Sequence, residues 1–460
     1  MNGEEKWPSL PANRTATGES HEVAPEELFF STTDELGVIT AANPVFVRLA
    51  RFGYQELMGA PHSIIRHPVM PGGAFKLMWD TLKAGEPFCA YVDNLASGGS
   101  TYSVFATITP LGEDSYISIR CRPRRTDLRG AAFQLYGPAR ARELEARGSG
   151  ASARTAAEIG LENLALGLRD AGFAEYEAFM QLALTAEVGL RLTLPPAVRP
   201  WATGPAADLL AAANNLSEEL GAWLAHQAKL AEVEAQLEAA IPKLRASMDD
   251  ALSTAKSLAA TVKSGFSPLM VWIDLWARMM DAIDPVLADV MDTLTDLRRA
   301  CLRTGFRVSL AVLHTQTVCQ CAVELIDDVT VPDYDPRARS AAIAALGQAL
   351  AEGFSATRHQ DVLSTVAAAS AAEQLGLVRD LMGIPQQLIA SWKQLATTRN
   401  DDLVLTILPR MTEQMGKTDA TLALLDELRE SVSSITQSAP AERVNPALDR
   451  TLRAMDALRV

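Results

Sequence analysis

Residues 61–68 (PHSIIRHP) place two histidines and an arginine within a short stretch of chain. Arginine and histidine side chains donate hydrogen bonds to charged and carbonyl oxygens. A tryptophan further along offers an aromatic wall, and two asparagines offer both donors and acceptors. Together these groups suit a pocket for a small ligand with a flat ring and polar oxygens. The predicted ligand-binding residues are Asn43, His62, Arg66, His67, Trp79 and Asn94.

Each of these residues also has a purely structural interpretation. The two histidines can cap helices or satisfy loop backbone, and Trp79 can belong to a hydrophobic core. His62 or His67 can equally serve as the axial ligand of a haem, because imidazole binds haem iron. A pocket that is empty or holds a metabolite is the remaining alternative. The sequence favours ligand binding because all six residues occur in one segment.

Residues 28–124 have the pattern of one mixed domain. Strand-forming residues and turn residues alternate at both ends of the segment, and apolar residues recur at spacings of three and four in its middle. Residues 97–100 (SGGS) are typical of a hairpin turn. We predict an α+β domain with one five-stranded antiparallel sheet and helices on one face. The expected strands are 29–33, 38–40, 88–95, 102–111 and 115–122.

The rest of the chain is predicted to be almost entirely helical. Residues 1–27 are polar and are expected to be a disordered lead without a secretory signal. Residues 125–155 are expected to be a linker with a hinge at 147–151, followed by a small helical module at 156–205. Residues 206–460 then form an Ala/Leu-rich bundle of long helices, with breaks expected near prolines. An apolar stripe supports a coiled-coil-like seam, and hence a parallel homodimer or a bundle that closes on itself. The stripe consists of Leu230, Val233, Leu237, Ile241, Leu244, Met248 and Leu252.

Composition narrows the classes of function. The net charge is −14, which argues against nucleic-acid binding because that requires clustered Lys and Arg. The most apolar stretch, residues 266–283, contains three charged residues, so we predict no transmembrane helix. The five cysteines are odd in number and lack a CxxC pair, as expected for reduced thiols in a cytoplasmic protein. No P-loop, GxGxxG, HExxH, kinase or cyclase signature is present, and we predict that the protein is not an enzyme.

The same 28–124 segment resembles the PAS domain of bacterial aerotaxis receptors and their soluble relatives. The resemblance rests on 30–34 (FSTTD), 38–43 (VITAAN), 53–59 (GYQELMG), 61–68 (PHSIIRHP), 74–75 (AF), 78–79 (MW) and 82–87 (LKAGEP). It implies a PAS fold that holds FAD non-covalently and senses redox state or oxygen supply. It also implies that the six predicted site residues occupy the family's flavin-site positions. We therefore expect a flavoprotein that transmits a signal to its helical region.

The chain departs from this family in several places. Val69 stands where an aspartate is usual, Phe88 replaces a tryptophan, and Leu95, Ala96 and Ser97 replace basic residues. The helical region lacks the methyl-accepting tip that engages the chemotaxis kinase, so its protein partner is unidentified. These departures favour the alternative function, a scaffold that uses the PAS fold for dimerisation or docking. The retained residues favour the sensor.

Overall fold

The computed structural model describes residues 14–112, 114–262, 270–398, 402–435 and 440–458. The chain divides into two compact units. Unit 1 comprises Met1–Leu224, Gly305–Thr357 and Pro440–Val460, and unit 2 comprises Ala225–Thr304 and Arg358–Ala439. Within the described residues, no helix has the length and apolar character needed to cross a membrane.

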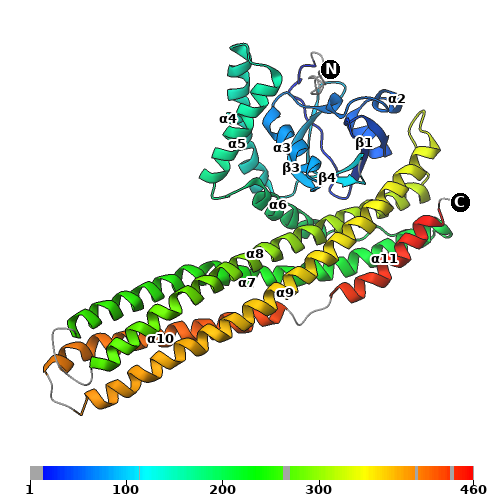
Figure 1. Ribbon diagram of the computed structural model, residues 1–460. Coiled ribbons are helices and arrows are strands. Elements are labelled where there is room, and N and C mark those ends of the chain that lie inside the picture. The colour runs from blue at the N-terminus through cyan, green and yellow to red at the C-terminus, as the bar shows by residue number, and fades with distance from the viewer. Residues whose placement is uncertain (1–13, 113, 263–269, 399–401, 436–439, 459–460) are drawn as a thin grey trace, which may run out of the picture. The chain divides into compact units, whose positions relative to one another are not determined.

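Unit 1 is built around a five-stranded antiparallel sheet in the order β2-β1-β5-β4-β3 (Figure 1). The strands are β1 (Leu28–Asp34), β2 (Ile39–Ala42), β3 (Phe88–Leu95), β4 (Thr101–Leu111) and β5 (Ser115–Cys121). Asp34 shapes the β1–β2 turn, where its Oδ1 accepts hydrogen bonds from the backbone N–H groups of Leu36 and Val38. Gly37 follows at φ +74°, a conformation that favours glycine. The predicted five-stranded antiparallel sheet with helices, followed by a large helical region, is confirmed.

Four short elements connect β2 to β3 and cover one face of the sheet. They are α1 (Pro44–Ala50), α2 (Tyr54–Leu57), the 3₁₀ helix η1 (His62–Ile65) and α3 (Gly72–Lys83). Phe46 of α1 is fully buried and packs in one hydrophobic cluster with Phe29, Tyr102 and Val104, which share this face of the sheet. Helix α1 begins at an asparagine cap because the side chain of Asn43 accepts a hydrogen bond from the Phe46 N–H.

The opposite face of the sheet is also covered by helices of unit 1. Tyr91 of β3 donates to the buried carboxylate of Glu187 in α6 (Tyr176–Arg191), with 2.9 Å between the oxygens. Oγ1 of Thr109 in β4 lies 3.3 Å from Nε2 of His314 in α8 (Met270–Ile326). The residues on this face join a single hydrophobic cluster with α6 and with the part of α8 that belongs to unit 1. The sheet therefore has helices on both faces and not on one face as predicted, because α6 and part of α8, which are distant in sequence, bury its second face.

The predicted linker at 125–155 is wrong for most of its length. Residues 126–148 form helix α4 (Thr126–Gly148), which is followed by a turn at 149–152 and by α5 (Ala153–Asp170). The Ala, Leu and Arg residues of this segment are good helix formers, and they outweigh its scattered glycines. The hinge expected at 147–151 coincides with the turn, where Gly150 adopts φ +90°.

Two neighbouring predictions also need correction. Residues 14–27 were expected to be disordered, but Val23 is 2% exposed and Ser20 forms a β-bridge with Thr101. Helices α5 and α6 were expected to form a module of their own. They instead contribute Leu164, Leu168 and Phe179 to the hydrophobic cluster that they share with the sheet. In both cases the segment is ordered against the sheet because it is buried against residues that are distant in sequence.

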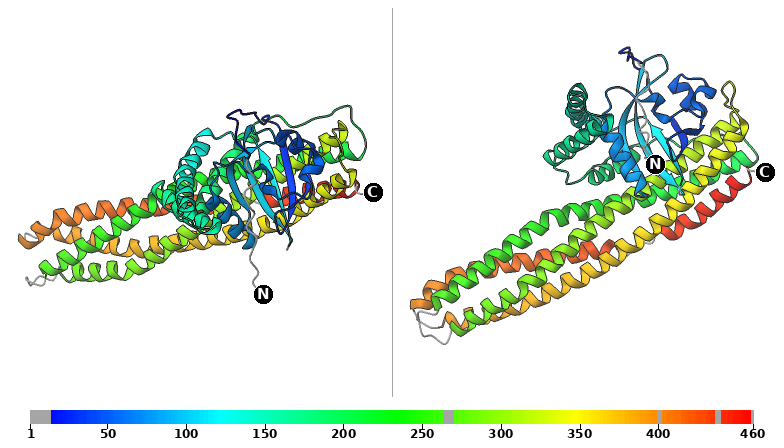
Figure 2. Two further views of the ribbon diagram at one scale, coloured as in Figure 1. Left: turned by 90° about the horizontal axis from the view of Figure 1, so that it is seen from above. Right: turned by 45° about the horizontal axis from the view of Figure 1, so that its top comes forward.

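Unit 2 consists of four helical segments that run side by side along their length (Figures 1 and 2). They belong to α7 (Pro205–Val262), α8, α9 (Pro336–Ala396) and α10 (Asp402–Ile435). One hydrophobic cluster includes residues from all four segments, so this bundle closes on itself within one chain. Of the predicted stripe, Leu244 is fully buried, and Ile241 and Leu252 pack against the cluster. The side chains of Leu230, Val233, Leu237 and Met248 lie outside the described residues.

Prolines do not divide the helices as predicted. Pro242, Pro285, Pro385 and Pro409 all lie inside continuous helices. An internal proline costs a helix one hydrogen bond, which packing along a long bundle can offset. The break expected near 265–268 lies outside the described residues. Helix α11 (Pro440–Asp456) returns to unit 1, where Val444 and Ala447 are buried in its main cluster.

Candidate ligand pocket

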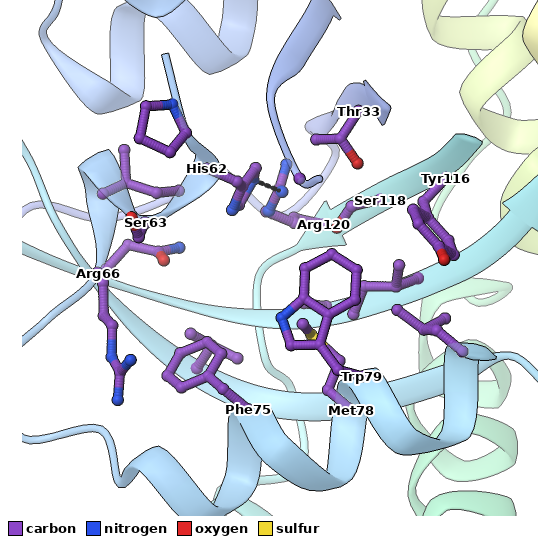
Figure 3. A pocket seen from close by; sticks show the side chains of 18 of the residues that line it. Thr33, His62, Ser63, Arg66, Phe75, Met78, Trp79, Tyr116, Ser118 and Arg120 are labelled. Carbon is purple, nitrogen blue, oxygen red and sulfur yellow. Dashed lines mark hydrogen bonds between the residues drawn. The ribbon is translucent and has the colours of Figure 1, made fainter. Parts of the chain in front are cut away.

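A pocket lies between the sheet and α3, with η1 and the β1–β2 turn completing its walls (Figure 3). It encloses about 980 Å³ of empty space, its open mouth included. The enclosed part of this space has a volume of about 120 Å³. Its lining is mostly apolar and contains no Asp or Glu. The polar lining residues are Thr33, His62, Ser63, Arg66, Asn94, Tyr116, Ser118 and Arg120.

Arg120 brings a buried positive charge to the pocket from β5. Its Nη2 donates to Oγ of Ser31 at 3.1 Å and contacts Nε2 of His62 (Figure 3). Burial lowers the pKa of Arg120 to about 10, so the guanidinium remains protonated at neutral pH. Burial, assisted by Arg120, lowers the pKa of His62 well below its usual value. His62 is therefore neutral at pH 7, and its Nε2 accepts a hydrogen bond from Nη2 of Arg120.

Arg66 and Asn94 lie next to each other in the backbone of the pocket wall, where they form an isolated β-bridge. The Arg66 guanidinium lies over the ring of Phe75, 4.1 Å from the centroid, and Nη2 donates to the carbonyl oxygen of Met70 at 3.3 Å. Burial lowers the pKa of Arg66 to about 10. The Asn94 side chain is 4% exposed, and its Nδ2 has no hydrogen-bond partner among the described residues.

Trp79 forms part of the pocket wall, as predicted from the sequence. Its ring makes an edge-on contact with Tyr116, with 5.5 Å between centroids. The same ring closes against the β1–β2 turn, where a Cβ added to Gly37 would lie 3.1 Å from it. Helix α3 carries Phe75, Met78 and Trp79 on the side that faces the sheet (Figure 3). The aromatic wall therefore depends on how α3 is held.

A buried carboxylate holds the first turn of α3. Glu143 of α4 is 1% exposed, and its two oxygens accept the N–H groups of Gly72 and Gly73, both at 2.7 Å. A negative charge at a helix N-terminus is stabilised by the helix dipole and the free N–H groups. Gly73 also allows α3 to approach α5 closely, because an added Cβ would lie 2.3 Å from the Leu161 nitrogen. Helices α4 and α5, outside the predicted PAS segment, thus position the pocket wall.

Two of the six predicted site residues do not line the pocket. Asn43 caps α1 and donates from Nδ2 to Oε1 of Glu324 in α8 at 2.9 Å. His67 is 6% exposed; its Nδ1 accepts the Val69 N–H at 3.2 Å, and its Nε2 lies 3.1 Å from Oγ1 of Thr101. His67 therefore has a structural role, which was the alternative to ligand binding for the two histidines of this segment. The structure brings His62, Arg66, Trp79 and Asn94 together at the pocket.

Sequence reasoning missed Arg120, Phe75 and Tyr116. Tyr116, Ser118 and Arg120 alternate along β5, so they all point to the same face of the sheet. An arginine on the inward face of a buried strand is unusual, and that alternation was the available signal. The two single-residue departures from the family pattern lie outside the pocket lining. Val69 is exposed, and Phe88 is buried and stacks on Tyr176 of α6.

The antiparallel sheet with its flanking helices and its pocket is PAS-like. No family model matches the chain. A stretch of 120 residues is 40% identical to the aerotaxis receptor of Escherichia coli (strain K12). The match covers 26% of this chain and 24% of the receptor, so the chain spans about a quarter of the length of that curated relative. This similarity supports an aerotaxis-type sensor segment and leaves the rest of the chain unassigned.

Proposed function

We propose that the PAS domain of unit 1 binds FAD and reports its redox state to the helices packed on the sheet. The observation that carries this proposal is an apolar pocket in which two buried donor atoms lack hydrogen-bond partners among the described residues. Nη1 of Arg120 and Nδ2 of Asn94 are unpartnered among the described residues, and both side chains line the pocket. Buried donors without acceptors are costly, so a ligand with carbonyl oxygens stabilises them. The flavin ring combines such oxygens with a flat apolar body.

The residues fit this group in distinct roles. Trp79, Phe75 and Met78 would pack on the flat ring, and Arg120 and Asn94 would donate to its oxygens. Arg66 also lines the pocket and would offer its guanidinium to the more polar part of the cofactor. When bound, FAD supplies one- or two-electron redox chemistry. Haem is less well suited, because His67 is turned away and Nε2 of His62 is engaged by Arg120.

Two contiguous routes lead from the pocket to helices of unit 1. The Arg120 guanidinium lies 5.1 Å from the ring centroid of Phe46 in α1, and the cap of that helix is bonded to Glu324 of α8. Beyond β5, the backbone N–H groups of Arg124 and Arg125 donate to Glu187 of α6 at 2.8 and 2.9 Å. A change of charge in the ligand would alter the hydrogen bonding of Arg120 and shift these contacts. The helices would then change their packing or the surface they offer to a partner.

The proposal extends to the cellular compartment, the absence of catalysis and the partners of the protein. We propose a cytoplasmic signalling protein without substrate turnover, with a homodimer or a protein partner formed through its helices. A role in aerotaxis or chemotaxis rests on the similarity to the bacterial receptor. The scaffold alternative has weaker support than it had from the sequence, because Val69 and Phe88 lie outside the pocket lining.

The decisive test is the absorption spectrum of the purified full-length protein. We expect flavin bands that bleach with dithionite, and FAD in the extract after denaturation. Protein that is purified without cofactor is to be titrated with FAD as well. A colourless protein that fails to bind added FAD rejects the flavin proposal and leaves the scaffold. A Soret band would instead assign the pocket to haem.

A further inference from the structure

Arg120 is the most unusual charged group in the pocket. It is 2% exposed and makes no ion pair in the part of the chain that the structure describes. The pocket lining offers no carboxylate, and the partners of Arg120 are the neutral groups Ser31 and His62. The rings of Phe29 and Phe46 lie 5.7 and 5.1 Å from its guanidinium carbon. These contacts compensate the buried charge only in part, because buried cations are normally paired with anions.

The contrast with Arg129 makes this point clear. Arg129 approaches the other face of the same sheet, where Nη2 donates to Oδ1 of Asp93 at 3.0 Å and to Oγ of Ser103 at 2.9 Å. Among the described residues, the chain therefore supplies a counter-ion on that face and none at the pocket. A partly satisfied cation with a free N–H in a cavity is a binding group that awaits an acceptor.

We propose that Arg120 recognises the ligand by donating from Nη1 to an electron-rich carbonyl oxygen, which for FAD belongs to the dicarbonyl edge of the flavin ring. This inference rests on the proposed function and specifies which part of the cofactor is read and by which residue. His62 acts as a positioning residue, since its neutral Nε2 holds the guanidinium in place. Asn94, on β3, supplies a second unpartnered donor elsewhere in the same pocket. The apolar wall at Trp79 remains for the non-polar part of the ring.

The test compares FAD binding by the full-length wild type, Arg120→Lys and Arg120→Met, with Arg129→Met as the matched control. FAD affinity is measured by titration, and the flavin carbonyl stretches are measured by infrared difference spectroscopy with isotope-labelled FAD. We expect Arg120→Met to lose at least tenfold in affinity and Arg120→Lys to lose less. In bound Arg120→Lys, a flavin carbonyl band should move to higher wavenumber as its hydrogen bond weakens. Arg129→Met should change neither affinity nor band position.

Thermal unfolding of each variant separates loss of recognition from loss of fold. If Arg120→Met does not fold, the band position in Arg120→Lys decides. Unchanged affinity and unchanged carbonyl bands in a folded Arg120 variant overturn the role of Arg120 and leave FAD binding intact. A wild type that binds no FAD overturns the proposed function and this assignment together. The two failures are therefore distinguishable.

Discussion

Nδ2 of Asn43 lies 2.9 Å from Oε1 of Glu324, which joins the cap of helix α1 to helix α8 across 281 positions of sequence. Oε1 also accepts from Nε2 of Gln320 at 3.0 Å. Glu324 is 4% exposed, and burial raises its pKa to about 7, an effect that these two hydrogen bonds and the charge of Arg339 only partly oppose. A carboxyl group that titrates near neutral pH thus lies where the first helix after β2 meets a long helix.

Glu324→Gln should make the stability of the protein less dependent on pH between about 4.5 and 7. The carboxyl pKa is higher in the folded state, about 7, than in the unfolded state, near 4.5. The folded protein therefore holds more protons between these values, and its free energy of unfolding falls as pH rises through this window. The neutral amide avoids that loss, which is at most roughly 3 kcal/mol for a shift of this size. Urea unfolding at pH 5 and pH 8 measures the effect as the variant-minus-wild-type difference.

His314 affects stability in an overlapping pH range with the opposite sign. Burial lowers the pKa of His314 to about 4, so its contribution to stability is lost as pH falls below the usual histidine pKa of 6.5. His314 is present in both proteins, and its effect cancels in the difference. If the Glu324→Gln and wild-type curves remain parallel from pH 5 to pH 8, the carboxyl group does not titrate in this window.

Asn43→Ser should uncouple α1 from α8 and leave ligand binding almost unchanged. A serine keeps a capping oxygen for the Phe46 N–H but cannot donate to both Leu28 O and Glu324 as Nδ2 does. We expect a loss of stability of roughly 1–3 kcal/mol, and about 1 kcal/mol more for Asn43→Ala, which also removes the cap. FAD titration with parallel urea unfolding checks both statements. A folded Asn43→Ser protein that binds no FAD would show that Asn43 is needed for ligand binding.

Gly73→Ala should destabilise unit 1 and loosen the pocket wall. The added methyl would lie 2.3 Å from the backbone nitrogen of Leu161, and backbone atoms cannot rotate away. Overpacking of this kind costs roughly 1–3 kcal/mol. Gly130→Ala in α4 is the matched control, because nothing lies within 4 Å of its added Cβ and alanine favours a helix by about 0.5–1 kcal/mol. Equal melting temperatures for the two variants would show that α3 and α5 do not pack closely.

Trp79→Ala should remove ligand binding at a moderate cost in stability. The indole is partly exposed and its ring faces the pocket, so truncation costs less than the roughly 3–5 kcal/mol typical of a fully buried large aromatic. We expect at least a tenfold loss of FAD affinity, with Trp79→Phe retaining most of it because the aromatic wall remains. Flavin content at saturation and thermal unfolding of the full chain are the two measurements. Full flavin occupancy in Trp79→Ala would exclude the ring from the site.

The sequence by itself determined the sheet, the helical content and most of the pocket's chemistry. Strand alternation, the turn residues around Gly37 and Gly99, and apolar spacing in residues 72–84 are local signals, and each one operated as expected. His62, Arg66, Trp79 and Asn94 were recognisable because their residue types and order are informative. The fold class follows from these local patterns, whereas the resemblance to a known family pointed to the four residues that line the pocket.

Tertiary structure decided what each polar residue contacts. No local pattern connects Asn43 to Glu324 or Gly73 to Glu143, because those partners are 281 and 70 positions apart and meet only through burial. Arg120 became a pocket residue because α3 packs on that face of β5, and Arg129 became ion-paired because Asp93 lies on the other. Helix α4 formed where a linker was expected. Its Glu143 is buried between α3 and α5 and accepts hydrogen bonds from α3, and these contacts stabilise an ordered helix there. Local sequence patterns therefore do not predict which residues distant in sequence come into contact, because tertiary packing determines those contacts.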